Sequence, residues 1–210
     1  MAQSRGTAPE RSPSASSASI DVRDPAVQRA LVQGIRAGDV GAFETVFRAY
    51  RAALARLATR VTESPELGDE VVHEVFLKIW QIRATWDVGV SLTAYLFAMT
   101  RNAALSVARR RRLETRWEAS LAEPDRDDAE IADSAPGPDN VAEALDSEAA
   151  MARVVETLPP RTREAFLLKW REQLTYPEIA AAMGTSVKTV EKQLGLAFKV
   201  LRRALRPWMP

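Results

Sequence analysis

The chain of 210 residues contains no cysteine and a single histidine, His73. Without cysteine the protein has no disulfides, no thiolate zinc site and no cysteine nucleophile, a composition that suits a reducing compartment. No second ligand at a suitable spacing accompanies His73, so we expect neither a metal site nor a histidine general base. A Gly-rich phosphate loop is also missing. We therefore expect a protein that is not an enzyme and that needs no cofactor.

Long apolar segments are absent as well. No run approaches the length that spans a bilayer, and the N-terminus lacks the hydrophobic core of a signal peptide. We expect a cytoplasmic protein with no direct membrane insertion. The formal net charge is only +1, but residues 114–148 contain 12 acidic residues against two arginines. The rest of the chain must therefore be strongly basic.

Helical periodicity dominates the sequence, and no β pattern accompanies it. The pattern predicts an all-α fold of two small helical domains, residues 24–113 and 149–207, joined by a flexible acidic linker, residues 114–148. Residues 1–23 are rich in Ser, Ala, Pro and Arg and almost lack large apolar side chains. Such a segment cannot offset the entropy lost on ordering, so we expect a disordered tail.

Four capping residues predict the helix starts of the first domain. They are Asp24, Asp39, Ser64 and Ser91, and each precedes an apolar pattern with helical spacing. The fourth helix is expected to end in the run of four arginines at residues 109–112.

Residues 174–205 predict a helix-turn-helix. Thr175 and Glu178 have the spacing of a capping box, and Gly184 can end the first helix in a left-handed conformation. Thr185 or Ser186 then caps a second helix. We expect Val187, Val190 and Leu194 to face inward. A generic pair of packed helices remains the alternative for this stretch alone.

The charge of the second helix favours DNA binding. From residue 186 onward Glu191 is the single acid, and a basic bias of this kind neutralises phosphates. The basic residues of this segment are Lys188, Lys192, Lys199, Arg202, Arg203 and Arg206.

Two further surfaces are candidates for function in the first domain. Aromatic residues at positions 86, 95 and 97 are followed by Arg101, Asn102 and the arginine run, a mixture that suits melted nucleic acid. The alternative is that the aromatic residues belong to the core and the arginines make a helix end soluble. The outer face of the third helix can dock on another protein, although its charge pattern alone favours a solvated face.

The residues in these motifs resemble the sigma-70 family of RNA polymerase sigma factors, particularly the short extracytoplasmic-function (ECF) type. Residues 69–80 and 94–104 are similar to the promoter-melting domain of that family. Residues 158–201, including 174–184 and 186–192, are similar to its minus-35-binding domain. The resemblance covers roughly half to two thirds of the chain, with both motifs in the family's order.

The resemblance implies a protein that binds core RNA polymerase, through its clamp helices and flap, and that binds double-stranded and melted promoter DNA. It also implies an anti-sigma factor as a regulatory partner. For the contact with core polymerase it implies Asp69, Glu70, His73, Glu74, Phe76 and Lys78. For the minus-10 DNA it implies Trp86, Tyr95, Arg101, Asn102, Arg109 and Arg110. For the minus-35 DNA it implies Thr185, Ser186, Lys188, Thr189, Glu191, Lys192 and Lys199.

Two other functions fit parts of the sequence. A free-standing helix-turn-helix regulator would read paired half-sites as a dimer, but no heptad stretch or spare apolar helix is evident. A sigma mimic that sequesters an anti-sigma factor could lose its basic recognition face, whereas this chain keeps Lys188 and Lys192.

Overall fold

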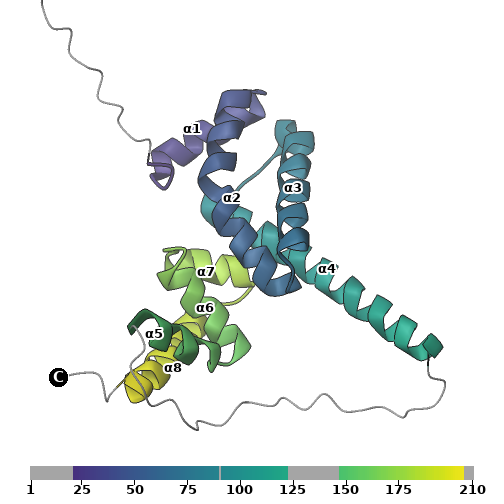
Figure 1. Cartoon of the computed structure of the whole chain (residues 1–210). Helices are drawn as coiled ribbons and strands as arrows, with labels where there is room; N and C mark the ends of the chain where they lie inside the picture. The colour runs from purple at the N-terminus through teal and green to yellow at the C-terminus, as the bar shows by residue number, and fades with distance from the viewer. Residues whose placement is uncertain (1–20, 90, 123–146, 206–210) are drawn as a thin grey trace, which may run out of the picture.

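The computed structural model describes residues 21–89, 91–122 and 147–205, and all regular structure in these ranges is helical. The all-α prediction is therefore confirmed. The elements shown in Figure 1 are α1 (Pro25–Arg36), α2 (Val40–Thr62), α3 (Pro65–Ile82), the 3-10 turn η1 (Arg83–Thr85), α4 (Leu92–Ala122), α5 (Ser147–Glu156), α6 (Pro160–Trp170), α7 (Tyr176–Met183) and α8 (Val187–Leu205).

The four predicted caps begin α1 to α4. The carboxylate of Asp24 accepts hydrogen bonds from the first turn of α1, and that of Asp39 does the same for α2. The hydroxyl of Ser64 accepts from Leu67 N at 3.2 Å, and that of Ser91 accepts from Ala94 N at 3.3 Å. Because these bonds satisfy backbone donors that have no partner within the helix, the starts could be predicted from local sequence.

Helices α1 to α4 form an N-terminal unit in which α2 packs along both α3 and α4 (Figure 1). The crossing of α2 and α3 is close at Gly68, where an added Cβ would lie 2.8 Å from the backbone N of Thr59. Only a residue without a side chain fits at that crossing. The core of the unit is made by buried apolar side chains, including Val46, Leu54, Leu57, Val72, Val75, Ile79 and Leu96.

Helix α4 is longer than predicted. It continues past the arginine run to Ala122, so residues 114–122, which we expected to belong to a flexible linker, are helical. The first helix breaker after the arginines is Pro124, and the acidic composition before it does not itself end a helix. Helix α5 begins at Ser147, slightly before the predicted boundary. Residues 123–146 of the expected linker and 1–20 of the expected tail lie outside the described residues.

Helices α5 to α8 form a C-terminal unit with its own core. Helix α8 packs against α5, α6 and α7. The buried side chains come from all four helices and include Val155, Leu158, Leu168, Leu174, Ile179, Val190, Leu194 and Leu201. The unit lies against the N-terminal unit chiefly where α7 meets α4.

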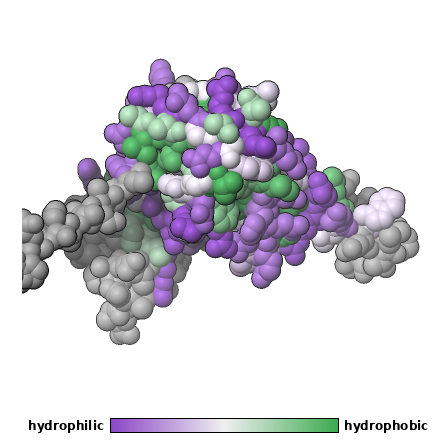
Figure 2. Space-filling view, turned by 90° about the horizontal axis from the view of Figure 1, so that it is seen from above, coloured by the Kyte–Doolittle hydropathy of each residue, from purple (hydrophilic) through white to green (hydrophobic). Residues whose placement is uncertain are grey.

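The surface of the molecule is largely hydrophilic in the view of Figure 2. On this face, seen from above Figure 1, hydrophilic side chains surround smaller apolar areas. On this face, a binding partner would therefore meet mainly polar and charged side chains.

Candidate nucleic-acid interface

The helix-turn-helix has the predicted turn. Thr175 and Glu178 form a complete capping box: each side chain accepts a hydrogen bond from the other's backbone N–H. Gly184 has φ 61°, and its N–H bonds back to the last turn of α7. Ser186 caps α8, since its hydroxyl accepts from Thr189 N at 3.2 Å. The turn thus changes the direction of the chain within the few residues between α7 and α8.

The outer face of α8 is basic. Five basic side chains lie on the helix against the single acid Glu191. Of the residues predicted for the minus-35 DNA, Thr185 is half-buried and the others are exposed. Val190 and Leu194 are buried as predicted, but the inward prediction for Val187 is wrong, because it lies at the start of the helix with 39% of its surface exposed. Helix α8 can therefore present cations and hydroxyls together to a DNA groove.

Trp86 is buried. Only 1% of its surface is exposed, and its ring packs edge-on against Tyr95 with 5.7 Å between centroids. Its Nε1 is buried without a hydrogen-bond partner. In this conformation Trp86, which the resemblance implies for the minus-10 DNA, belongs to the core, in agreement with the alternative interpretation, and the half-buried Tyr95 reaches the surface. The loop that carries Trp86 must move before the indole can meet a base.

Arg101 is also removed from solvent. Its side chain is 11% exposed and makes a bidentate ion pair with Glu164 of α6, with Nε–Oε1 at 2.6 Å and Nη2–Oε2 at 3.1 Å. The other minus-10 residues on α4 are available, since Asn102, Arg109 and Arg110 are exposed. The structure therefore separates the predicted minus-10 residues into an accessible group and a covered one.

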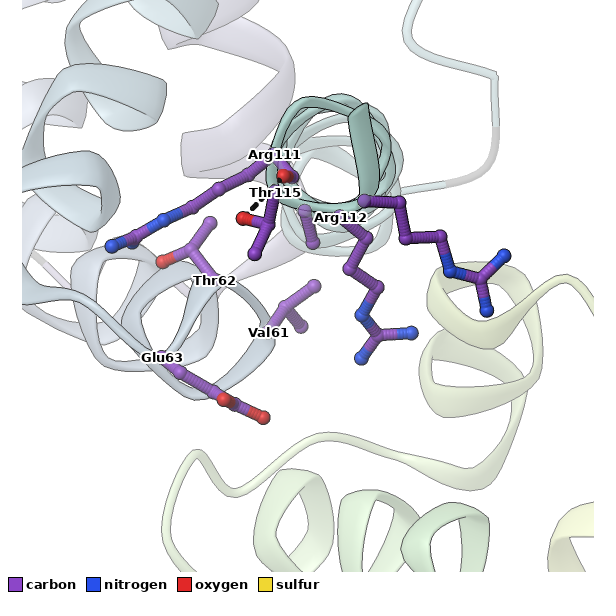
Figure 3. Close-up of a pocket in the computed structure, with 8 residues that line it drawn as sticks. Val61, Thr62, Glu63, Arg111, Arg112 and Thr115 are labelled. Atoms are coloured by element: carbon purple, nitrogen blue, oxygen red, sulfur yellow. Dashed lines mark hydrogen bonds between the residues drawn. The ribbon is translucent and has the colours of Figure 1, made fainter. Parts of the chain in front are cut away.

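A hollow of about 590 Å³ lies beside the arginine run, between the end of α2 and α4 (Figure 3). Three arginines line it, Arg111, Arg112 and Arg116, against one acid, Glu63. Glu63 ends α2 in a left-handed conformation, with φ 59°. The excess of cations makes this hollow suitable for the phosphate groups of a nucleic acid.

The predicted polymerase surface on α3 is mostly exposed. His73 lies on this face with Glu70, Glu74 and Lys78, while Asp69 is half-buried and pairs with Arg51 at 3.2 Å. Phe76 departs from the prediction. It is 3% exposed and packs edge-on against Phe43 and Phe47, so it supports the helix from within.

An aromatic cluster in the C-terminal unit joins the buried Phe166 to Trp170 and Phe198, which reach the surface. The rings of Phe166 and Trp170 are stacked 4.7 Å apart, and Trp170 meets Phe198 edge-on at 4.8 Å. Trp170 is 40% exposed and Phe198 45%. Apolar rings at the surface favour contact with a protein partner. Sequence reasoning assigned these residues no role, although their i, i+4 spacing in α6 was a usable signal.

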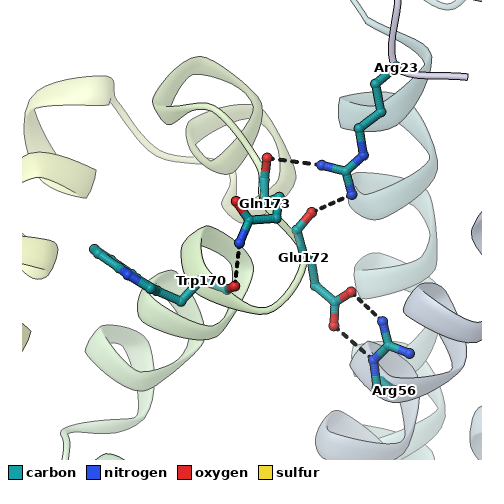
Figure 4. A network of polar contacts seen from close by, with 5 residues as sticks. All are labelled: Arg23, Arg56, Trp170, Glu172 and Gln173. Carbon is teal, nitrogen blue, oxygen red and sulfur yellow. Dashed lines mark hydrogen bonds and ion pairs between the residues drawn. The ribbon is translucent and has the colours of Figure 1, made fainter. Parts of the chain in front are cut away.

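A second group that sequence reasoning missed joins the two units (Figure 4). Glu172, 2% exposed, receives a bidentate ion pair from Arg56 of α2, and its backbone O accepts from Arg23. These partners are 116 and 149 residues away along the chain. No local pattern could have paired them.

The described residues hold no group of three side chains suited to binding a metal ion. No helix among them is long and apolar enough to cross a membrane.

Two family models match the chain, and both belong to sigma-70. "Sigma-70 region 2" matches residues 46–114, and "Sigma-70, region 4" matches residues 148–201. Together they cover more than half of the chain. The chain belongs to the sigma-70 family. The first model covers most of α2, all of α3 and α4 as far as residue 114, and the second covers the helix-turn-helix and the helices packed on it.

Curated relatives place the chain among the ECF sigma factors. RNA polymerase sigma factor NccH of Alcaligenes xylosoxydans xylosoxydans is 28% identical over 83% of this chain and 92% of its own length. The ECF RNA polymerase sigma-E factor of Escherichia coli is 25% identical over 84% of this chain and 93% of its length. The ferric citrate uptake sigma factor FecI of the same organism is 26% identical over 74% and 86%.

Solved structures support the fold. CnrH, in complex with the cytosolic domain of CnrY, has a TM-score of 0.56 at 24% identity, over 85% of this chain and 97% of CnrH. The sigma factor RpoE of Bartonella quintana, in complex with the anti-sigma factor NepR, has a TM-score of 0.56 at 21% identity, over 80% and 98%. This chain is thus an ECF sigma factor that associates with RNA polymerase and directs promoter-specific transcription.

Proposed function

We propose that α8 reads the minus-35 element and that α4 with the preceding loop reads and melts the minus-10 element. The supporting observation is the charge of α8, which carries five basic side chains and one acid and follows the tight turn after α7. The exposed arginines of α4 supply the second contact. Residues 24–113 and 149–207 would then be the two functional domains, with α4 extending beyond the first.

We assign the contacts with core polymerase to two surfaces, one on each unit. The exposed face of α3 at His73 and Glu74 would meet the clamp helices, and the cluster of Phe166, Trp170 and Phe198 would meet the flap. An anti-sigma factor would cover one or both of these surfaces and so prevent the protein from binding core polymerase. We also propose that the chain acts in the cytoplasm and has no enzymatic activity of its own.

Run-off transcription tests the assignment. Sigma-free core polymerase and fragmented genomic DNA are incubated with and without the protein, and the 5′ ends of the transcripts are mapped. Discrete new starts that share two upstream elements are expected. Neither new starts nor a complex with core would favour a free-standing DNA-binding regulator, while a core complex without new starts would favour a sigma mimic.

A double substitution tests the role of α8. Replacing Lys188 and Lys192 by alanine should reduce promoter-specific transcripts by about tenfold or more, because two phosphate or base contacts are lost. Binding to core should be unchanged. Arg153→Ala, which removes an exposed cation from α5, is the matched control. Equal losses in both variants would contradict the assignment.

A further inference from the structure

Two ion pairs join the units, and in both pairs the cation belongs to the N-terminal unit and the anion to the C-terminal unit. The N-terminal unit contributes Arg56 and Arg101, and the C-terminal unit contributes Glu172 and Glu164. Both pairs are bidentate, the geometry in which an arginine binds a carboxylate most strongly. We call these two ion pairs, with the further contacts described next, the interdomain interface.

Two other contacts extend this interface. The guanidinium of Arg23 donates to the backbone oxygens of Glu172 and Gln173 at 2.8 and 3.1 Å. Ser91, which caps α4, donates to Glu178 Oε1 at 2.8 Å. Figure 4 shows Arg23 and Arg56 reaching Glu172 and Gln173 from the N-terminal unit. The contacts thus reach the end of the loop that carries Trp86, at Ser91, and the capping box of α7, at Glu178.

The interface covers one residue that was assigned to DNA. Arg101 is on the predicted minus-10 surface, and the carboxylate of Glu164 occupies the position of an anionic ligand on its guanidinium. Glu178 belongs to the helix-turn-helix and holds the start of α4 through Ser91. An acid of the minus-35 unit therefore competes with a phosphate of the minus-10 DNA for the same arginine.

We infer that the free protein is held closed by the interdomain interface, in which Glu164 occupies the place of a DNA phosphate on Arg101 and must be displaced before promoter DNA is bound, while the pair of Glu172 with Arg56 holds the two units together. The inhibition of promoter binding rests on the proposed function, but the closure of the free chain does not depend on it. Because the side chain of Arg56 is 38% exposed, salt weakens its pair with Glu172 and with it the closed form. Polymerase favours the open form, because it holds the two units at the separation of the two promoter elements.

Fluorescence energy transfer measures closure directly. The chain has no cysteine, so Ala30→Cys in α1 and Ala204→Cys in α8 provide two unique dye positions, both exposed. Raising the salt from 0.1 to 1 M should lower the transfer efficiency. Adding Glu164→Gln and Glu172→Gln should raise the ratio of open to closed molecules by about tenfold at low salt, since both charge pairs are lost. Unchanged efficiency in salt and in the double variant would overturn the inference.

The matched control is Glu156→Gln, which removes the same charge from an ion pair with Arg163 inside the C-terminal unit. It should leave the transfer efficiency unchanged. Circular dichroism checks that each variant is folded. The reversed pair, Arg56→Glu with Glu172→Arg, provides a second test: Arg56→Glu alone should open the chain, and the second change should restore closure. Failure of the restored pair to close would also contradict the inference.

DNA binding tests the inhibitory role. Without polymerase, the double glutamine variant should bind a promoter fragment about five- to tenfold more tightly than wild type, beyond any change in Glu156→Gln. Opening without tighter binding would overturn the inhibitory role. If wild type closes as described but gives no promoter-specific starts with core polymerase, the proposed function fails while closure stands.

Discussion

At the scale of single residues, a buried polar network joins α1 to the start of α4. The amide of Gln28 donates to Thr93 Oγ1 at 2.9 Å and to Tyr50 OH at 3.2 Å, and its oxygen accepts from Leu92 N at 3.1 Å. Tyr50 OH in turn donates to the backbone oxygen of Val22. The network provides an acceptor for the backbone N–H of Leu92, which has no partner within α4. Gln28 therefore supports the start of α4 together with the Ser91 cap.

Gln28→Leu should destabilise the protein by about 1–3 kcal/mol, because the N–H of Leu92 and the hydroxyl of Thr93 lose a buried partner. Urea unfolding followed by circular dichroism measures the loss. Gln33→Leu makes the same change at an exposed position of the same helix and should stay within about 0.5 kcal/mol of wild type. Equal effects would show that the network does not stabilise the fold.

The hydroxyl of Tyr50 makes stability depend on alkaline pH. Burial raises the pKa of Tyr50 above its usual 10.0, against the opposing effect of its hydrogen bond with Thr93. The neutral phenol is thus favoured in the folded state. Its contribution is fully present below pH 10 and is lost as the pH rises through the raised pKa, because the unfolded chain ionises first.

The expected result is a steeper fall in the free energy of unfolding above pH 10 in wild type than in Tyr50→Phe. Urea titrations between pH 8 and 11 on both proteins isolate the Tyr50 contribution, since all other groups titrate in both. Parallel curves would contradict the raised pKa.

At the scale of elements, glycines decide how closely helices cross and where they turn. At Gly68 a Cβ would lie 2.8 Å from the backbone N of Thr59 and 2.4 Å from its hydroxyl oxygen, so α2 and α3 would have to separate. Gly195 in α8 is the opposite case, with open space around the position of its Cβ. The same residue type is thus required in one helix and dispensable in the other.

Gly68→Ala should cost about 1–3 kcal/mol of stability, because the α2–α3 contact is the largest in the N-terminal unit and the backbone of Thr59 cannot easily move away. Gly195→Ala should instead stabilise the protein by about 0.5–1 kcal/mol, since alanine is the better helix former. Thermal or urea unfolding of the two variants should therefore shift in opposite directions. A stabilised Gly68→Ala would show that the crossing is looser than described.

At the scale of the whole molecule, two helical units have separate cores and share a charged interface. The core of the C-terminal unit is made from α5 to α8 alone. A unit of this size buries a modest fraction of its surface and is expected to be marginally stable by itself. The interdomain interface therefore adds to the stability of a unit that can still fold without it.

Residues 147–210, produced as a separate chain, should be helical but should unfold at a lower urea concentration than in the full-length protein. The loss of Arg56 and Arg101 leaves Glu172 and Glu164 without partners, which accounts for the shift. Circular dichroism at rising urea measures it. In the separate chain Glu172→Gln should no longer destabilise, and an unchanged midpoint between the two chains would contradict the coupling.

Much of the fold was decided locally and could be predicted from the sequence. The caps at Asp24, Asp39, Ser64 and Ser91, the capping box of α7 and the left-handed Gly184 depend on residues a few positions apart. The all-α class and the basic face of α8 follow from the same short-range patterns. The sigma-70 motifs were recognisable for this reason.

Tertiary structure alone decided which predicted residues are accessible. The family resemblance assigned Trp86 and Phe76 to binding surfaces, but both lie in the core because neighbouring helices cover them. Arg101 meets Glu164 across 63 residues of sequence, and Arg56 meets Glu172 across 116. Contacts at such separations depend on how finished helices pack, and helical periodicity does not specify that packing. The sequence by itself therefore determined the helices and the family, whereas the interdomain interface and its control of the DNA surface arose only on folding.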